Sequence, residues 1–175
     1  MQQNGAYLIK GEQVEQLKNV CLVEKNGKYT INKKWVGKDA SLFLKALGIE
    51  SDARLVIAEV PADHPFVYVE MMMPVLGIVR VKNIDEAIEL ACKAEHGNRH
   101  SAHIHSKNVD NLTRFAKAVE TTIFVKNAPS YSALGVGAEG YPTFTIASKT
   151  GEGLSSARTF TKARRCVLKD SLSIK

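Results

Sequence analysis

Short apolar runs alternate with amphipathic segments along most of this chain, and this alternation limits its fold more than any other feature. Residues 54–60 and 75–81 are largely apolar runs of strand length, and residues 121–125 form a third. Asn83 and Asn108 each precede a segment with apolar residues at helical spacing. Buried strands separated by amphipathic helices are typical of parallel sheets. The sequence therefore predicts an α/β fold, with an open, mainly parallel sheet and helices on both faces.

Turn and cap residues predict where smaller elements begin and end. The pair Asn26 and Gly27, between two β-type runs, predicts a hairpin. Asp39 is expected to begin a helix that Gly48 ends in a left-handed conformation. Glu86, three residues after Asn83, completes the pattern of a capping box.

Composition places the chain among ordinary globular proteins, with 45% hydrophobic and 24% charged residues. It shows neither an apolar run long enough to span a membrane nor a signal peptide. Three widely spaced cysteines favour a reducing cytosol over a disulfide framework. The formal charge of +6 comes from scattered cations, and the densest cluster, residues 162–165, lies in an expected strand rather than a helix. We therefore expect a cytoplasmic protein that binds no membrane, and a solvated lysine-rich surface explains the charge better than nucleic-acid binding does.

After Asn127 the helical and strand periods stop. Residues 128–153 contain five of the twelve glycines and two prolines, which predicts a long structured loop. Long loops in compact domains usually serve a function. Residues 155–168 then predict a short helical turn followed by a strand.

The loop contains Gly135, Gly137 and Gly140, which match the dinucleotide fingerprint G-x-G-x-x-G letter for letter. That fingerprint needs a strand before it and a helix after it, so that the pyrophosphate meets a helix N-terminus. Residues 141–146 are instead expected to be extended and contain a proline. We therefore predict no phosphate-binding loop here.

Four histidines lie close together, namely His96, His100, His103 and His105. Imidazole is a common zinc ligand. However, no cysteine or aspartate completes the set, and residues 101–105 are expected to form a short strand. We expect no metal site.

Residues 70–80 read E-M-M-M-P-V-L-G-I-V-R and resemble the E-x-F-G-P-V segment of the aldehyde dehydrogenase superfamily. Together with the later I-F-V-K-N-A-P-S and T-G-E-G-L-S-S-A-R-T-F, they resemble one branch of it. This branch is the CoA-acylating acetaldehyde and propionaldehyde dehydrogenases of ethanolamine and propanediol utilisation. The resemblance implies that residues 1–153 are the C-terminal part of the catalytic domain, and residues 154–175 a tail with an oligomerisation strand.

The reaction that this resemblance implies is aldehyde + CoA + NAD⁺ to acyl-CoA + NADH. The family's nucleophilic cysteine and cofactor domain are expected upstream of anything present here. We therefore expect the chain alone to be inactive and to carry no bound NAD or CoA. Cys21 lies in a segment that superficially resembles the nucleophile segment, but it stands only 49 residues before Glu70. We expect it to be a structural cysteine at the entrance of a hairpin strand.

The resemblance also assigns roles to single residues. Glu70 would accept hydrogen bonds from the nicotinamide-ribose hydroxyls, although a solvated strand end is the alternative. Met72 stands where the family has a phenylalanine that packs on this ribose, whereas Met71 and Met73 are at least as well explained as core residues.

His100 lies in R-H-S-A, which resembles the G-H-T-A segment of the acylating enzymes. It could move a proton or contact the CoA sulfur, and a histidine satisfied by backbone is an equal alternative. The aldehyde end of the active site would be lined by Asn127, Pro129 and Ser130.

The small aldehyde and CoA would be the partners of the parent enzyme, which is expected to be a homo-oligomer in the cytoplasm or inside a bacterial microcompartment. Two other classes of function stay open. One is a non-catalytic module that binds other subunits through its C-terminal strand. The other is a basic nucleic-acid-binding domain.

Overall fold

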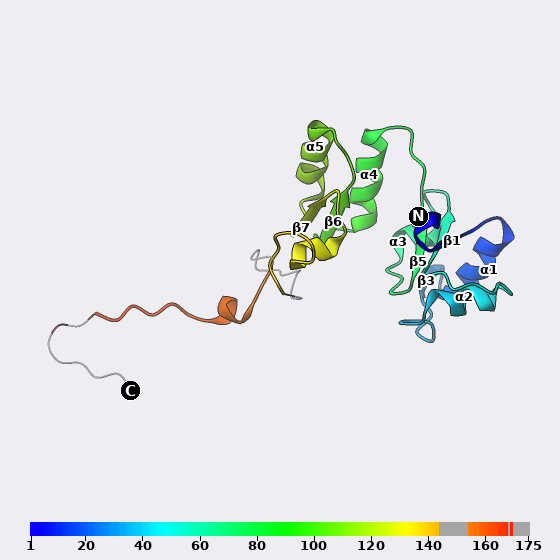
Figure 1. The fold of residues 1–175 in the computed structure, drawn as a ribbon, viewed down its shortest axis with the longest axis horizontal. Helices are drawn as coiled ribbons and strands as arrows, with labels where there is room; N and C mark the ends of the chain where they lie inside the picture. Colours follow the sequence, from blue (N-terminus) through cyan, green and yellow to red (C-terminus); the bar gives the residue numbers. More distant parts are fainter. Residues whose placement is uncertain (144–153, 168, 170–175) are drawn as a thin grey trace. The chain divides into compact units, whose positions relative to one another are not determined.

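The computed structural model describes residues 1–143, 154–167 and 169. It contains two compact units, Met1–His96 and Gly97–Lys175 (Figure 1). Among the described residues, none of the helices combines the length and apolar character needed to traverse a bilayer. The domain boundary expected after residue 153 adjoins residues 144–153, which lie outside the described ranges, so it stays a prediction.

The first unit contains a parallel sheet, a hairpin and short helices, all within described residues (Figure 1). In chain order its elements are η1 (Gln2–Asn4), β1 (Ala6–Ile9), α1 (Glu12–Cys21), β2 (Leu22–Lys25), β3 (Lys28–Ile31), α2 (Ala40–Ala46), β4 (Leu55–Glu59), α3 (Pro65–Tyr68), β5 (Val75–Ile78) and α4 (Ile84–Glu95).

The sheet has the order β1-β4-β5, and both pairs of strands are parallel. Leu8 of β1 is opposite Ile57 of β4, and Ala58 of β4 is opposite Gly77 of β5. The central strand β4 is buried on both faces, because Val56, Ile57 and Ala58 are all at most 4% exposed. Side chains alternate between the faces of a strand, so this pattern requires cover on each side. The predicted α/β class and parallel sheet are confirmed.

The core of this unit lies between the sheet and the first two helices. Helix α1 buries Leu17 and Cys21, which are four residues apart on one helical face. Helix α2 contributes Phe43 and Leu44, which are fully buried with them. Cys21 is the last residue of α1, so the expectation that it enters a hairpin strand was wrong by one residue.

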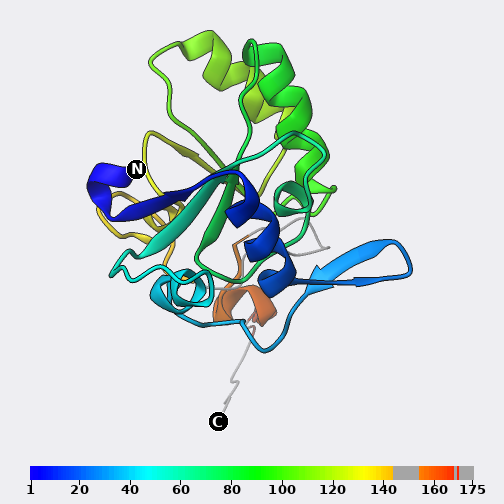
Figure 2. The same ribbon diagram turned by 90° about the vertical axis from the view of Figure 1, so that its right-hand side faces the viewer.

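The predicted hairpin at Asn26 and Gly27 is confirmed. Strands β2 and β3 pair antiparallel, and Lys25 is opposite Lys28. Asn26 has φ 54° and Gly27 has φ 73°, and a two-residue turn with two positive φ angles matches the right-handed twist of the strands. Figure 2 shows this hairpin extending away from α1.

The helix starts agree with the predictions, although the cap bonds differ in detail. Asp39 is the N-cap residue of α2, but its side chain makes no cap hydrogen bond. At α4, the Asn83 side chain accepts a hydrogen bond from the Glu86 backbone N–H at 3.0 Å. The Glu86 carboxylate accepts from Lys82 N–H at 2.8 Å, one residue before the partner expected for a capping box.

The second unit contains a parallel strand pair and one longer helix. Its elements are β6 (Ser101–Ile104), α5 (Val109–Val119), β7 (Ile123–Lys126), η2 (Ser130–Leu134) and η3 (Ala157–Phe160). The Asn108 side chain caps α5 by accepting from Asp110 and Asn111 N–H at 2.9 and 3.1 Å. Phe115 of α5 is buried, with its ring 5.6 Å from the ring of Phe124 in β7.

The tail shows the predicted helical turn as η3, held by a capping box between Ser156 and Thr159. Residues 164–167, expected to be a strand, form none in this single chain, and Leu168 lies outside the described residues. A strand is defined by hydrogen bonds to a neighbouring strand, which for an oligomerisation strand belongs to another chain. The oligomerisation strand therefore stays a prediction.

A close contact between α3 and β5 gives a test of the fold. A Cβ atom at Gly77 would lie 3.0 Å from Phe66 Cβ and 3.3 Å from Val60 Cγ2. Gly77→Ala is therefore expected to lower the free energy of unfolding by about 1–3 kcal/mol, measured by urea denaturation. Leu76→Ala is the control, because Leu76 is 40% exposed. Equal losses for both variants would contradict tight packing of α3 on β5.

Candidate functional site

The segment 70–74 joins α3 to β5 and carries the two candidate cofactor residues. Glu70 is exposed. Met71 is 8% exposed and belongs to the core, Met72 is 61% exposed, and Met73 packs partly against the core. The segment thus buries one methionine and presents Glu70 and Met72 to solvent, so the core explanation holds for Met71 and not for Met72.

The backbone at Met72 is in an uncommon conformation. Its φ is 50°, in the left-handed region, where a residue other than glycine is strained by about 1–3 kcal/mol. The Met72 carbonyl accepts a hydrogen bond from Gly37 N–H at 3.4 Å. Strain of this kind persists only where surrounding contacts hold it, and it gathers at functional sites. The Met72 side chain is thus presented to solvent from a strained backbone.

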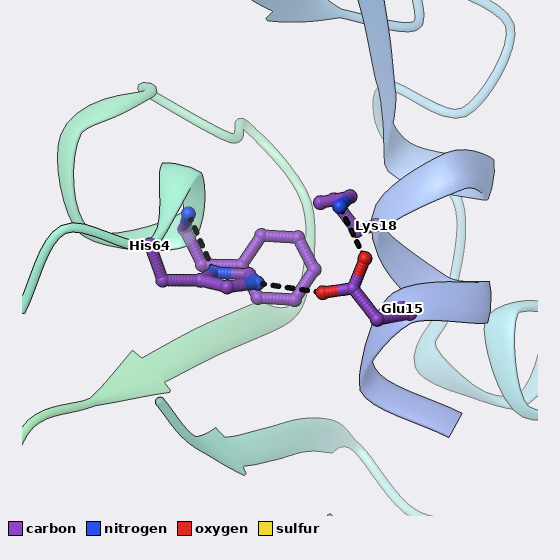
Figure 3. A network of polar contacts seen from close by, with 4 residues as sticks. Glu15, Lys18 and His64 are labelled. Atoms are coloured by element: carbon purple, nitrogen blue, oxygen red, sulfur yellow. Dashed lines mark hydrogen bonds and ion pairs between the residues drawn. The ribbon is translucent and has the colours of Figure 1, made fainter. Parts of the chain in front are cut away.

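His64, which the sequence analysis missed, begins α3 six residues before Glu70. Its Nδ1 accepts a hydrogen bond from Phe66 N–H at 3.2 Å, and its ring lies 4.7 Å from the Phe66 ring. Its Nε2 is 3.7 Å from a Glu15 carboxylate oxygen, which is too long for a hydrogen bond, and Glu15 also contacts Lys18 (Figure 3). Since Nδ1 accepts, the neutral ring carries its proton on Nε2, which is directed at Glu15.

A sequence signal for His64 existed in the proline that follows it. Pro65 occupies the first position of α3, where proline is favoured, and the residue before such a proline is a cap candidate. The one-turn helix α3 is short, and His64 provides its N-cap while Phe66 packs it on β5. His64 therefore helps to fix the position of the backbone just before Glu70.

His100 lies immediately before β6, at the strand end where it was expected. Its carbonyl accepts a hydrogen bond from Ile123 N–H at 3.1 Å, and its Nδ1 lies 3.0 Å from the Ser101 hydroxyl. The neighbouring Arg99 forms an ion pair with Glu120 at 2.9 Å. The backbone of His100 thus belongs to the strand pair, while its side chain is exposed.

Asn127 has a structural role that its sequence context did not reveal. Its side-chain oxygen accepts from Ser106 N–H at 2.7 Å, and its side-chain nitrogen donates to the Ser106 carbonyl at 3.0 Å. These bonds join the chain after β7 to the chain after β6. Pro129 and Ser130 follow at the start of η2, and the Pro129 carbonyl accepts from Ser132 N–H at 3.0 Å. Asn127 therefore shapes the turn that presents Pro129 and Ser130.

The glycine motif forms a closed loop and no nucleotide-binding turn. The N–H of Tyr141 donates to the Ala133 carbonyl at 2.9 Å, which folds the loop back on η2. Residues 141–143, directly after the motif, are not helical. Among the described residues, a helix therefore does not follow the motif directly, whereas the fingerprint requires one.

The remaining alternatives concern metal ions and Cys21. Within the described ranges, no three histidine, cysteine or carboxylate side chains gather as a metal site would require. Cys21 is fully buried, and burial raises its pKa to about 12. A thiol of this kind is protonated at neutral pH and cannot act as a nucleophile. Its environment is that of a structural cysteine.

Comparison with known proteins identifies the group to which this chain belongs. The profile of the aldehyde dehydrogenase family matches residues 53–142, which is more than half of the chain and includes Glu70, Met72, His100 and the turn at Asn127. The chain belongs to the aldehyde dehydrogenase family.

Several aldehyde dehydrogenases match almost the whole chain. It is 47% identical, over 99% of its length, to the acetaldehyde dehydrogenase (acetylating) EutE of Salmonella typhimurium. The propionaldehyde dehydrogenase of Rhodopseudomonas palustris, solved with bound propionyl-CoA, is 49% identical with a TM-score of 0.89 over 95% of this chain. A propionaldehyde dehydrogenase from the fucose utilisation bacterial microcompartment of Clostridium phytofermentans is 55% identical over 98% of this chain, with a TM-score of 0.85.

The matched part is a minor share of each relative. The chain covers 38% of the Salmonella enzyme, 37% of the Rhodopseudomonas structure and 39% of the Clostridium structure. The similarity therefore describes one part of these enzymes.

The buried His64 predicts a dependence of stability on pH. Burial lowers its pKa below the ordinary value of 6.5. As pH falls through about 6.5, the unfolded chain binds a proton at this residue before the folded chain does. Stability is therefore lost between pH 6.5 and the lower folded pKa, by at most about 1.4 kcal/mol per pH unit. In His64→Asn, which keeps an acceptor for Phe66 N–H, this loss should shrink.

The measurement is urea denaturation at pH 7.5 and 5.5, monitored by the fluorescence of Trp35, the single tryptophan, which lies in the same unit. His103→Asn is the matched control, because His103 is exposed on β6. The same acid-induced loss in His64→Asn and in the unaltered chain would show that His64 is not the group responsible.

Proposed function

We propose that this chain is the C-terminal part of the catalytic domain of a CoA-acylating aldehyde dehydrogenase, with residues 154–175 as its tail. The parent would convert an aldehyde, CoA and NAD⁺ into an acyl-CoA and NADH. Identity of 47% with an acetylating acetaldehyde dehydrogenase, and of 49% with a propionaldehyde dehydrogenase solved with bound propionyl-CoA, supports this reaction. The observation that carries the proposal is the segment 70–74, which presents Glu70 and a strained Met72 while Met71 anchors it in the core.

Glu70 is suited to hold the ribose of the nicotinamide nucleotide. Its carboxylate can accept hydrogen bonds from two hydroxyl groups at once. Its neighbour Met71 is buried, so the carboxylate is displayed from a fixed backbone. Met72 would pack against the same ribose, and its flexible thioether can adapt to NADH and then to the pantetheine arm of CoA. NAD⁺ would accept the hydride in this site.

His100 is suited to the acyl-transfer half of the reaction. It is exposed at the start of β6, and imidazole is the side chain best suited to take up a proton near neutral pH. When the CoA thiol attacks the thioester of the parent, this thiol must lose a proton, and a histidine can accept it. Pro129 and Ser130, presented by the turn that Asn127 holds, would line the aldehyde end.

The nucleophilic cysteine and the cofactor domain are proposed to lie in the rest of the parent. Cys21 is buried and protonated, so it is no substitute for that nucleophile. The chain alone is then without turnover. We also propose that the tail joins copies of the parent into a homo-oligomer. The parent would act in the cytoplasm or inside a bacterial microcompartment. The Clostridium relative comes from such a microcompartment.

A second candidate function is a non-catalytic module that binds other subunits. The observation that favours it is the exposed apolar surface of the tail, where Phe160 is 79% and Val167 78% exposed. A contiguous exposed apolar patch marks an interaction surface, and this candidate function requires that the two side chains belong to one.

Replacement of Glu70 tests the proposed function. In the parent enzyme, Glu70→Gln should keep the fold and raise the KM for NAD⁺ or slow hydride transfer by about tenfold, because an amide replaces one acceptor oxygen by a donor. Steady-state kinetics with NAD⁺, aldehyde and CoA each varied give the measurement, and Glu50→Gln at an exposed position is the control. The 175-residue chain alone should show no turnover. Unchanged kinetics in Glu70→Gln would remove Glu70 from the site.

Replacement of His100 separates the two half-reactions. In the parent, His100→Ala should lower CoA-dependent turnover by about 10²-fold, the usual contribution of a general acid or base. Hydride transfer, followed as the first burst of NADH, should change less. His103→Ala, on the exposed side of the same strand, is the control. If the variant loses only thermal stability and keeps its CoA-dependent turnover, His100 has a structural role instead.

The tail is tested by its effect on assembly. Light scattering should show the intact chain as a dimer or a larger species, because the proposed oligomerisation strand would pair with another chain. Deletion of residues 160–175 should give a smaller or an insoluble species. A monomer at high concentration for the intact chain would argue against both the oligomerisation strand and the interaction module.

A further inference from the structure

The one-turn helix α3, which leads into the segment 70–74, is held by a histidine at each end. At its start, His64 Nδ1 accepts a hydrogen bond from Phe66 N–H at 3.2 Å. At its last residue, the Tyr68 carbonyl lies 3.3 Å from His96 Nε2, and the two rings are in contact with their centroids 5.8 Å apart. Because a carbonyl only accepts hydrogen bonds, His96 Nε2 is the donor there. One histidine therefore serves α3 as an acceptor and the other as a donor.

The ring of His64 has a second direction in which it can form a bond. The residue is 8% exposed, and among the described residues its buried Nε2 has no hydrogen-bond partner. Figure 3 shows this nitrogen directed at Glu15 of α1, whose carboxylate oxygen lies 3.7 Å away. A buried donor without a partner is unfavourable, so a small movement of the ring toward Glu15 would gain a bond.

A proton on His64 exchanges these two interactions. In the neutral ring, Nδ1 offers an electron pair to Phe66 N–H, whereas in the imidazolium both ring nitrogens are donors. Nδ1–H then faces Phe66 N–H, donor against donor, and the cap of α3 is lost. At the same time Nε2–H becomes a charged donor to the Glu15 carboxylate, which strengthens that contact. His96 behaves differently, because its Nε2 remains a donor to Tyr68 in either state.

Charged groups from two elements determine how readily His64 takes up this proton. Glu15 and Lys18 lie on α1, and Asp63 precedes His64 in its own turn. Burial lowers the pKa of His64, the negative charge of Glu15 opposes this, and Lys18 adds to it. Asp63 also favours the charged ring. The hydrogen bond from Lys18 lowers the pKa of Glu15, so an ionised acceptor is available in mild acid.

We infer that His64 is a positioning residue for the cofactor segment and that its proton acts as a switch on this segment. At neutral pH the ring caps α3, which ends two residues before Glu70. In acid the ring pairs with Glu15 instead, and a helix of one turn loses one of its few anchors. The segment 70–74 is then held less firmly, and the affinity of the parent for the nicotinamide nucleotide falls. The identity of this ligand rests on the proposed function.

Nuclear magnetic resonance of the intact 175-residue chain tests the switch itself. Long-range correlations of the histidine ring nitrogens report which nitrogen carries the proton, and the signals missing in His64→Asn belong to His64. At pH 7.5 Nδ1 should be unprotonated. As pH falls it should become protonated, and the amide signals of Phe66 and residues 69–72 should shift with the same midpoint. A protonated Nδ1 at pH 7.5, or signals at 69–72 that do not follow His64, would overturn the inference.

Replacement of Glu15 changes the switch and leaves the sequence of α3 intact. Glu15→Gln removes a charge that favours the protonated ring, so the midpoint of the His64 titration should move to lower pH. Glu12→Gln is the matched control one turn earlier on α1, because Glu12 is exposed and accepts a hydrogen bond from Gln16 instead. Its midpoint should not move. Equal shifts in both variants would show that the contact with Glu15 does not govern the proton.

Kinetics of the parent test the consequence for the cofactor. From pH 7.5 to a pH below the His64 midpoint, the KM for NAD⁺ should rise by about fivefold, the equivalent of one lost N-cap bond, and the KM for the aldehyde should change less. His64→Asn keeps an acceptor that takes up no proton, so its KM should stay low at both pH values. His64→Ala should have the high KM at both. His96→Asn should retain the acid response, because only His64 turns from acceptor to donor.

Two results distinguish the switch from the proposed function. An equal acid rise in KM in His64→Asn and in the unaltered parent would overturn the switch, even where Glu70→Gln shows the segment to bind the cofactor. Unchanged kinetics in Glu70→Gln, with signals at 69–72 that follow His64, would reject the cofactor segment and leave the effect of the proton on α3 standing.

Discussion

The first unit depends on the burial of β4 between its two parallel neighbours. Val56, Ile57 and Ala58 exclude water from both faces of this strand, and α1 and α2 bury Leu17, Phe43 and Leu44 with it. Burial of apolar side chains is the main favourable term in folding. Because β5 pairs with β4 in a fixed register, the chain that enters β5 is also fixed. That chain is the segment with Glu70 and Met72, so the core of the unit determines where the candidate cofactor residues stand.

Several weak interactions refine the position of this segment. His64 caps α3 and Phe66 packs on β5 at Gly77, which fixes the chain before Glu70. Met71 is held in the core, and the Gly37 N–H holds the Met72 carbonyl in a strained conformation. Each contact contributes little alone, since a hydrogen bond adds about 0.5–1.5 kcal/mol. Together they present two neighbouring side chains to solvent from a rigid base, which is what a binding site for a cofactor needs.

The two units divide the proposed chemistry between them. Glu70 and Met72 belong to Met1–His96, whereas His100 and the turn at Asn127 belong to Gly97–Lys175. In the proposed reaction the first set handles the nucleotide and the second handles acyl transfer and the aldehyde. The chain matches less than two-fifths of the relatives' length. The parent would therefore have to supply both the nucleophile and the groups that complete each set.

The local sequence pattern was enough to predict those elements that depend only on residues close together in the chain. The hairpin at Asn26 and Gly27, the caps at Asn83 and Asn108 and the apolar strands are governed by backbone conformation and by side-chain alternation, which act over a few residues. Tertiary structure alone decided which methionine is buried, because that depends on how α3 packs on β5. It also revealed His64, since burial beside Glu15 joins residues 49 positions apart. His96 likewise meets Tyr68 only because α4 packs against α3, and no spacing in the sequence encodes that contact.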